Sequence, residues 1–156
     1  MARRRRADKL TLAPDPKFSS ELVTRLVNVT MERGKKSVAE SIVYGALEEI
    51  ESKMKQDPLE VLIRAIDNIK PKVEVRSRRV GGATYQVPVE VNRDRQLALA
   101  LRWLVEFSAG RKGTPMGVAM ANELIDAYKN QGNAVRKRDD THKMAQANKA
   151  FAHYAW

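Results

Sequence analysis

Hydrophobic side chains recur at steps of three and four residues along most of the chain, which predicts a mainly α-helical protein. The clearest example runs from Ser37 to Met54, where Val38, Ile42 and Ala46 share one side of the predicted helix. Capping residues, first-turn prolines and closing glycines mark five further segments of this kind. The sequence therefore predicts about six helices, which begin near Ser20, Ser37, Asp57, Asn92, Thr114 and Val135.

One stretch, residues 72–91, departs from the helical pattern. Valines alternate with other residues on both sides of Gly81-Gly82, and this period of two predicts a β-hairpin between the third and fourth helices. A turn of only two glycines would pair Val75 with Pro88 and divide the valines between the two faces of the hairpin. Because paired residues share a face, an apolar root requires a three-residue loop or a bulge, and we predict that register.

Toward its tip the predicted hairpin becomes cationic and polar, with Arg76, Arg78, Arg79, Thr84 and Tyr85. Strands of about eight residues would let it extend roughly 25 Å from the body. An isolated hairpin is only marginally stable in water, so its valine-rich root is expected to pack on the helices. These features predict a protruding arm that reaches into an anionic partner.

Composition narrows the class of partner. The chain has 156 residues, enough for one domain with a core of its own. Its 29 lysines and arginines outnumber 19 aspartates and glutamates, which gives a net charge of +10 and a pI of about 10.0. This excess favours a polyanion, either nucleic acid or an anionic membrane surface. No apolar run is long enough to span a bilayer, and the polar N-terminus argues against a peripheral membrane protein.

The residues that usually carry catalysis are scarce. The chain has no cysteine, which excludes disulfides and cysteine zinc sites and suits the reducing cytoplasm, and its N-terminus lacks the apolar segment of a secretory signal. The two histidines, His142 and His153, would lie about 16 Å apart along one helix, too far for one metal ion. No nucleotide-binding or nucleophile motif is present. We predict that the protein is not an enzyme and has no cofactor, metal site or small-molecule substrate.

We predict that residues 1–17 form a flexible basic arm and that residues 18–156 form a helical domain. Pro14 and Pro16 disfavour helix in this segment. Four consecutive arginines favour an anionic target over a solvated tail without one. These are Arg3, Arg4, Arg5 and Arg6.

Further basic clusters have both a binding and a structural interpretation. Lys35 and Lys36, between two predicted helices, either hold phosphates or favour the end of the preceding helix through its dipole. Arg102 shares a helix face with Arg95 but also has Glu106 at i+4, so a surface ion pair competes with binding. The last cluster is the short loop of Arg111 and Lys112.

Aromatic side chains have alternative roles as well. Trp103 and Phe107 lie four residues apart on a leucine-rich helix, which indicates core packing rather than base stacking. The last helix is expected to run to Trp156 and to present a stripe of Met144, Ala147, Phe151 and Tyr154. The aromatic end either contacts another protein or docks on its own domain.

Three motifs, in their order and spacing, cover nearly the whole chain. The first runs from Leu22 to Ala46 and includes Gly34-Lys35-Lys36. The second is the arm KVEVRSRRVGGATYQVPVEV with the nearby LALRWLV, and the third is the ending ANKAFAHYAW. Together they resemble the bacterial form of small-subunit ribosomal protein seven. The sequence departs from many relatives at Ala155, where a basic residue is expected.

This resemblance implies a protein that binds the 3′ major domain of 16S rRNA and nucleates assembly of the head of the small subunit. It also implies a hairpin near the exit-site tRNA and the mRNA path, with small-subunit proteins nine and eleven as partners. The rRNA-binding residues carried over from the motifs are Lys35, Lys36, Arg76, Arg78, Arg79, Arg95 and Arg102. Charge and expected exposure add Arg3, Arg4, Arg5, Arg6, Arg111 and Lys112.

Two smaller sets follow from the same resemblance. The positions near tRNA and mRNA are Arg78, Arg79, Gly81, Gly82 and Tyr85. Tyr85 either stacks on a base or covers Arg79 by a cation–π contact on the same strand face. The expected protein contacts are Phe151, Tyr154 and Trp156.

A cationic two-stranded arm on a helical body also fits an architectural DNA-binding protein. Such arms often carry a large apolar wedge at the tip, whereas this tip reads Val80-Gly81-Gly82-Ala83. DNA binding therefore stands as the alternative function. Copurification of the native protein with ribosomal subunits or with a nucleoid would separate the two.

Overall fold

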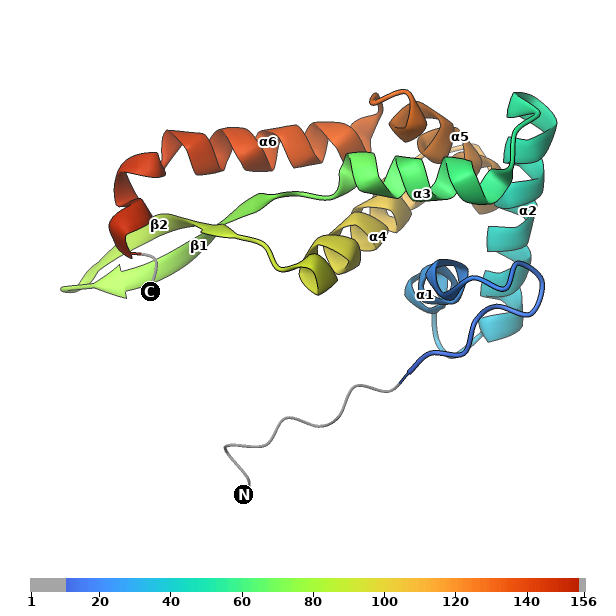
Figure 1. The fold of residues 1–156 in the computed structure, drawn as a ribbon, viewed down its shortest axis with the longest axis horizontal. Coiled ribbons are helices and arrows are strands. Elements are labelled where there is room, and N and C mark those ends of the chain that lie inside the picture. Colours follow the sequence, from blue (N-terminus) through green and yellow to red (C-terminus); the bar gives the residue numbers. More distant parts are fainter. Residues whose placement is uncertain (1–10, 155–156) are drawn as a thin grey trace, which may run out of the picture.

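The computed structural model describes residues 11–154, and its order of elements confirms a mainly α-helical protein with one β-hairpin between the third and fourth helices (Figure 1). The α-helices are α1 (Glu21–Thr30), α2 (Lys36–Met54), α3 (Pro58–Ile69), α4 (Arg93–Ala109), α5 (Met116–Tyr128) and α6 (Asn133–Ala147). The hairpin consists of β1 (Val73–Val80) and β2 (Ala83–Glu90), and a 3-10 helix, η1 (Lys149–Tyr154), follows α6.

α3 forms where the sequence provides both a start signal and an apolar face. The carboxylate of Asp57 accepts a hydrogen bond from the backbone N–H of Leu59, and Pro58 occupies the first turn of α3. One side of α3 is then buried through Leu62, Ile66 and further apolar residues. Within residues 11–154, no helix is both long and apolar enough to cross a membrane.

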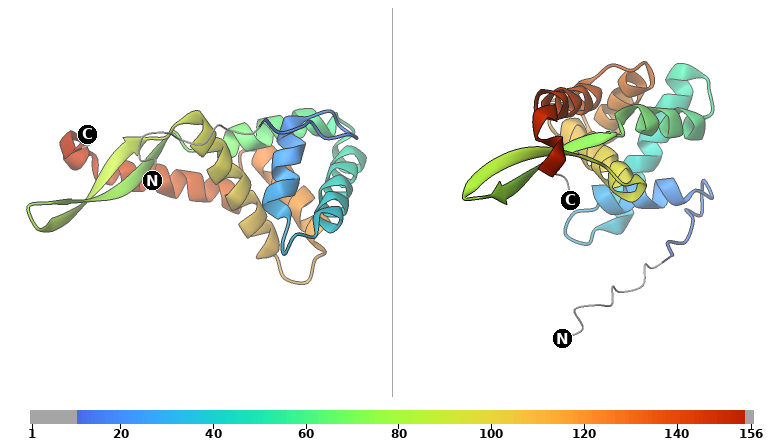
Figure 2. Two further views of the ribbon diagram at one scale, coloured as in Figure 1. Left: turned by 90° about the horizontal axis from the view of Figure 1, so that it is seen from below. Right: turned by 60° about the vertical axis from the view of Figure 1, so that its left-hand side comes forward.

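The main core lies among α1 to α5 and the start of α6. Its largest buried side chains include Leu26, Leu47, Ile66, Leu104 and Leu124, all at most 1% exposed. The hairpin, most of α6 and η1 extend together from this body, and α6 runs beside the hairpin in each view (Figures 1 and 2). α6 and η1 therefore support the root and middle of the arm, whereas its Gly81-Gly82 tip is exposed.

The hairpin register differs from the predicted one. A two-residue turn joins the strands, so that Val75 pairs with Pro88. Gly81 and Gly82 both have positive φ, +58° and +91°, as this turn requires. No bulge is needed because both faces of the root contact the body: Val73 and Pro88 line a groove with α6, while Glu74 on the opposite face reaches α4.

The C-terminal helix is shorter than its hydrophobic pattern predicts. It ends at Ala147, Asn148 terminates it, and the chain then turns into η1. Met144 is 50% exposed and Ala147 is also exposed, so the predicted continuous stripe is wrong. The buried face of α6 instead contains Thr141 and Ala145.

The segment before α1 is anchored closer to the N-terminus than the predicted boundary at residue 17. Asp15 is 5% exposed, and its carboxylate accepts hydrogen bonds from the N–H of Lys17 and of Phe18 and from the hydroxyl of Tyr44 on α2. The hydrogen bond to Asp15 raises the pKa of Tyr44 to about 12. The predicted contacts Arg3, Arg4, Arg5, Arg6 and Trp156, like Ala155, lie outside the described residues.

Candidate nucleic-acid interface

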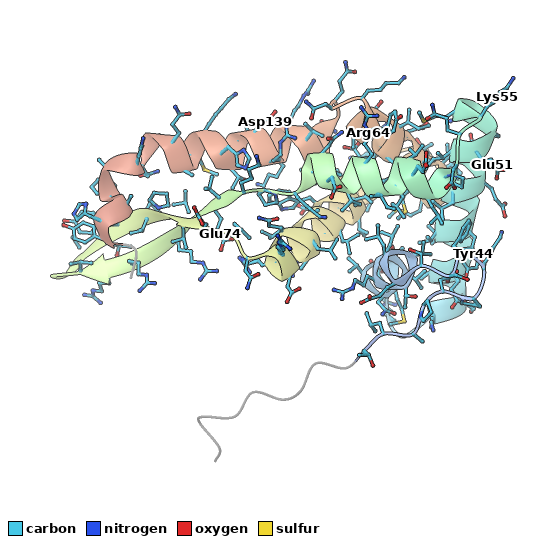
Figure 3. All side chains as sticks on the ribbon, viewed as in Figure 1. Tyr44, Glu51, Lys55, Arg64, Glu74 and Asp139 are labelled. Carbon is cyan, nitrogen blue, oxygen red and sulfur yellow. The ribbon has the colours of Figure 1, made fainter. Side chains whose placement is uncertain are left out.

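The root of the arm holds a carboxylate between two arginines. Glu74 is 7% exposed, and its Oε1 accepts a hydrogen bond from Nε of Arg76 at 2.7 Å. Nε of Arg95, in the first turn of α4, donates to both carboxylate oxygens at 2.9 Å. Glu74 thus brings together two predicted RNA-binding residues, Arg76 from the arm and Arg95 from α4. Figure 3 shows Glu74 on the hairpin.

The Glu74 carboxylate is charged in this setting. Burial by itself would raise its pKa, but the hydrogen bonds from Arg76 and Arg95 outweigh burial and lower the pKa below its ordinary value. Both arginine side chains remain 50% exposed. The root therefore presents two adjacent, partly exposed cations.

The predicted contacts at the arm tip lie far from the body. Arg79, Gly81 and Gly82 are exposed there, and Arg78 is half-buried. Arg78 is paired with Tyr85, whereas Arg79 is paired with Thr84. Because neighbouring residues on a strand point to opposite faces, Tyr85 does not share a face with Arg79, and the predicted cation–π arrangement is wrong.

Tyr85 belongs instead to an aromatic cluster with η1. Its ring centroid lies 5.3 Å from that of Phe151 and 5.2 Å from that of Tyr154. Of the two roles open for the aromatic end, the structure shows docking on the protein's own hairpin. The sequence pattern predicts that the stretch Arg78–Tyr85 projects freely. In the structure, one end of this stretch is held by η1 through Tyr85.

The two lysines of the turn after α1 lie at the beginning of α2. Lys35 is the N-cap residue and Lys36 the first helical residue, and both are exposed. The preceding helix ends at Thr30, so neither lysine belongs to its last turn, where the effect of the dipole is concentrated. Cations are disfavoured at a helix N-terminus, and the exposed side chain of Lys36 lies 3.7 Å from Glu40 one turn along α2. Phosphate binding by this pair stays a prediction. Figure 1 places the start of α2 well away from the hairpin.

In the loop before α5, the two adjacent basic residues have different surroundings. Lys112 is exposed, but Nη2 of Arg111 lies 2.5 Å from Oε2 of Glu123 and 2.8 Å from Oδ2 of Asp126. Glu123 is fully buried and also accepts the backbone N–H of Ala134 at the start of α6. Hydrogen bonds to Glu123 and Asp126 raise the pKa of Arg111. Glu123 on α5 therefore connects the loop that carries Arg111 to the start of α6.

The remaining predicted residues lie on α4. Arg102 is exposed, and within residues 11–154 no ion pair joins it to Glu106. Trp103 is 8% exposed and Phe107 packs against the core, which confirms their structural interpretation.

His142 has a structural position on α6. Its Nε2 accepts a hydrogen bond from the backbone N–H of Lys72 at 3.0 Å, which ties α6 to the start of the arm. Burial lowers the pKa of this imidazole, so the neutral form that accepts the bond is favoured.

Sequence reasoning missed three buried acids: Asp15, Glu74 and Glu123. A signal existed for two of them. Glu74 stands between two valines of a strand, and Glu123 occupies a core-facing position of α5, beside Leu124. An acid in an apolar position is stable only with a partner, but the sequence did not show which cation would supply it.

Comparison with known proteins identifies the family of this chain. Residues 2–149 match the family model for ribosomal protein S7p/S5e. Proteins named small ribosomal subunit protein uS7 from Anaeromyxobacter sp. (strain K) and Myxococcus xanthus (strain DK1622) are 59% and 56% identical to this chain. In both cases the match covers 100% of each sequence. The chain therefore belongs to the ribosomal protein S7p/S5e family.

Proposed function

We propose that this protein is a structural constituent of the small ribosomal subunit that binds the 3′ major domain of 16S rRNA and nucleates assembly of the head. The observation that carries the proposal is the family relation over the full chain length. The separate exposed basic clusters support it, because rRNA offers phosphates on several sides of a bound protein. The protein acts through binding rather than catalysis.

The proposed rRNA contacts fall into three groups. Lys35 and Lys36 bind from the start of α2, and Arg76 and Arg95 bind from the root of the arm. Arg102 and Lys112 bind from the body. Arg111 contributes mainly to the fold, because its guanidinium already bridges two carboxylates.

The arm tip is proposed to lie near the exit-site tRNA and the mRNA path, in the cytoplasmic ribosome. Arg78, Arg79, Gly81 and Gly82 would approach RNA there, while one side of Tyr85 packs on η1. The C-terminal end, with Phe151 and Tyr154, is proposed to face small-subunit proteins nine and eleven. Its docking on the hairpin would place these protein contacts beside the RNA contacts of the arm.

A salt titration tests the proposed function. If about six phosphates are engaged, the logarithm of the affinity for a transcript of the 3′ major domain should fall against log salt with a slope of roughly −4 to −5. Duplex DNA of equal length serves as the competitor for the alternative, an architectural DNA-binding protein. A nearly flat slope, or equal affinity for DNA and the transcript, would contradict the proposal.

The lysines at the start of α2 allow a sharper measurement. In a variant with Lys35→Gln and Lys36→Gln, the free energy of unfolding should change by less than about 0.5 kcal/mol. Relief of the unfavourable dipole interaction offsets the loss of the exposed, 3.7 Å pair between Lys36 and Glu40. Affinity for the transcript should fall, and the salt slope should become shallower by roughly 1.5 to 2.

The matched control removes two lysines from the other end of the same helix. Lys53 and Lys55 lie at the C-terminal end of α2, where the dipole favours cations. Changing both to glutamine should lower stability and leave the salt slope nearly unchanged. If the Lys35 and Lys36 variant instead loses stability and keeps its slope, the pair has a structural role.

A further inference from the structure

Glu74 is an unusual residue to find in a cationic arm. It is buried on β1 and faces Val89 across the hairpin, with 10% of its side chain exposed. Burial of an unpaired carboxylate would cost several kcal/mol, so its neighbours must compensate for the charge. One arginine would be enough to neutralise it, yet it binds two.

The contacts of the two arginines restrict how their guanidinium groups can point. Nε of Arg76 and Nε of Arg95 donate to the same oxygen, Oε1 of Glu74. Arg95 is held at both carboxylate oxygens, whereas Arg76 is held through Nε. Half of each side chain faces solvent. The carboxylate thus holds two like charges side by side, on residues that come from the arm and from α4.

This arrangement leaves the three groups with one net positive charge. Two guanidinium groups repel each other, and a phosphate that contacts both would relieve the repulsion. Arginine loses side-chain entropy when it is ordered, and a pair already held by Glu74 loses less of it on binding. Arginine also presents a fork of donors that matches the oxygens of a phosphate.

We infer that Glu74 is a positioning residue for RNA binding, which orients Arg76 and Arg95 as a preformed clamp for backbone phosphate at the root of the arm. The inference rests on the proposed rRNA-binding function. By its charge alone, Glu74 opposes RNA binding. In the role inferred here, the same residue strengthens RNA binding.

Charge and positioning make opposite predictions for Glu74→Gln. This change raises the net charge of the protein by one, so charge alone predicts tighter binding to RNA. Loss of positioning predicts weaker binding, by roughly five- to ten-fold at 0.1 M salt, because each phosphate contact contributes about 0.9 to the salt slope. The slope itself should become shallower by about one.

The matched control is Glu90→Gln, which removes an exposed acid from the other strand of the same hairpin. Its affinity for the 3′ major domain transcript should equal or exceed that of the wild type. Glu74→Asp is the second test variant, because it keeps the charge but withdraws the carboxylate by one methylene group from the positions of the two arginines. Circular dichroism melting identifies which variants are folded, and affinity and slope are compared among those.

The outcomes separate this inference from the proposed function. The positioning role is supported if the wild type has a steep slope and a folded Glu74 variant, Glu74→Gln or Glu74→Asp, binds more weakly with a shallower slope. The control Glu90→Gln must not show these losses. A steep wild-type slope with unchanged or tighter binding by these variants would overturn it and leave rRNA binding intact. A flat wild-type slope would overturn the proposed function itself. If Glu74→Gln does not fold, Glu74→Asp alone decides the comparison.

Discussion

Replacing Glu123 with alanine is expected to lower the free energy of unfolding by roughly 3 kcal/mol. The change removes the fully buried partner of Arg111 and leaves the N–H of Ala134 without its acceptor. Removal of one member of a buried ion pair typically costs 3–5 kcal/mol, and the partial exposure of Arg111 reduces that value. For a chain of this length, the melting temperature should fall by about 10 °C, measured by calorimetry or circular dichroism.

Asp126 provides the matched control for Glu123. It pairs with the same Nη2 of Arg111, but its side chain is 41% exposed. Asp126→Ala should therefore cost less than about 1 kcal/mol, as exposed ion pairs do. Similar losses for the two variants would show that burial of Glu123 does not determine the stability of this junction.

The helical body was predictable where local signals agree with the packing, as they do in α3. The Asp57 cap, the first-turn Pro58 and the buried stripe of α3 all favour the same helix. The core position of Trp103 followed from its leucine-rich surroundings in the same way. In these parts, the residues that the sequence pattern places on the apolar face of a helix are the ones that the tertiary structure buries.

The register of the hairpin was not predictable from its valines. The prediction assumed that only one face of the hairpin packs on the body, which requires the apolar residues to lie together. In the structure, α6 approaches the face that carries Val73 and Pro88, and α4 reaches Glu74 on the other. A pattern within one hairpin contains no information about how many helices surround it.

The candidate site shows the same limit. Charge identified the exposed cations, such as Lys35 and Arg79. It could not distinguish them from Arg111, which forms an ion pair with the buried Glu123. The distinction depends on acids that are far away in the sequence. Glu123 lies on the next helix, and the contact between Glu74 and Arg95 joins a strand to α4.

The aromatic cluster of Tyr85, Phe151 and Tyr154 predicts that changes at Tyr85 and changes at the arm tip have different effects. Tyr85→Ala should loosen η1, because each ring pair contributes about 0.5–1.5 kcal/mol beyond the burial of its area. Amide hydrogen exchange in residues 149–154 should become roughly ten- to a hundred-fold faster. The melting temperature should fall by less than about 3 °C, because the core among α1 to α5 is not touched.

Shortening the arm while keeping Tyr85 is the matched comparison. Arg78 and Tyr85 are directly opposed, so a two-residue Asn-Gly turn can join them in place of residues 79–84. This variant should keep the wild-type exchange rates in η1 and its melting temperature within about 2 °C. It should still assemble into the head of the small subunit but retain exit-site tRNA less well, because the exposed tip is lost. Removal of all of residues 78–85 would combine the two effects. If the short-arm variant loses many degrees of stability, or if Tyr85→Ala leaves exchange in η1 unchanged, then the arm does not consist of an exposed tip and a middle section that Tyr85 anchors to η1.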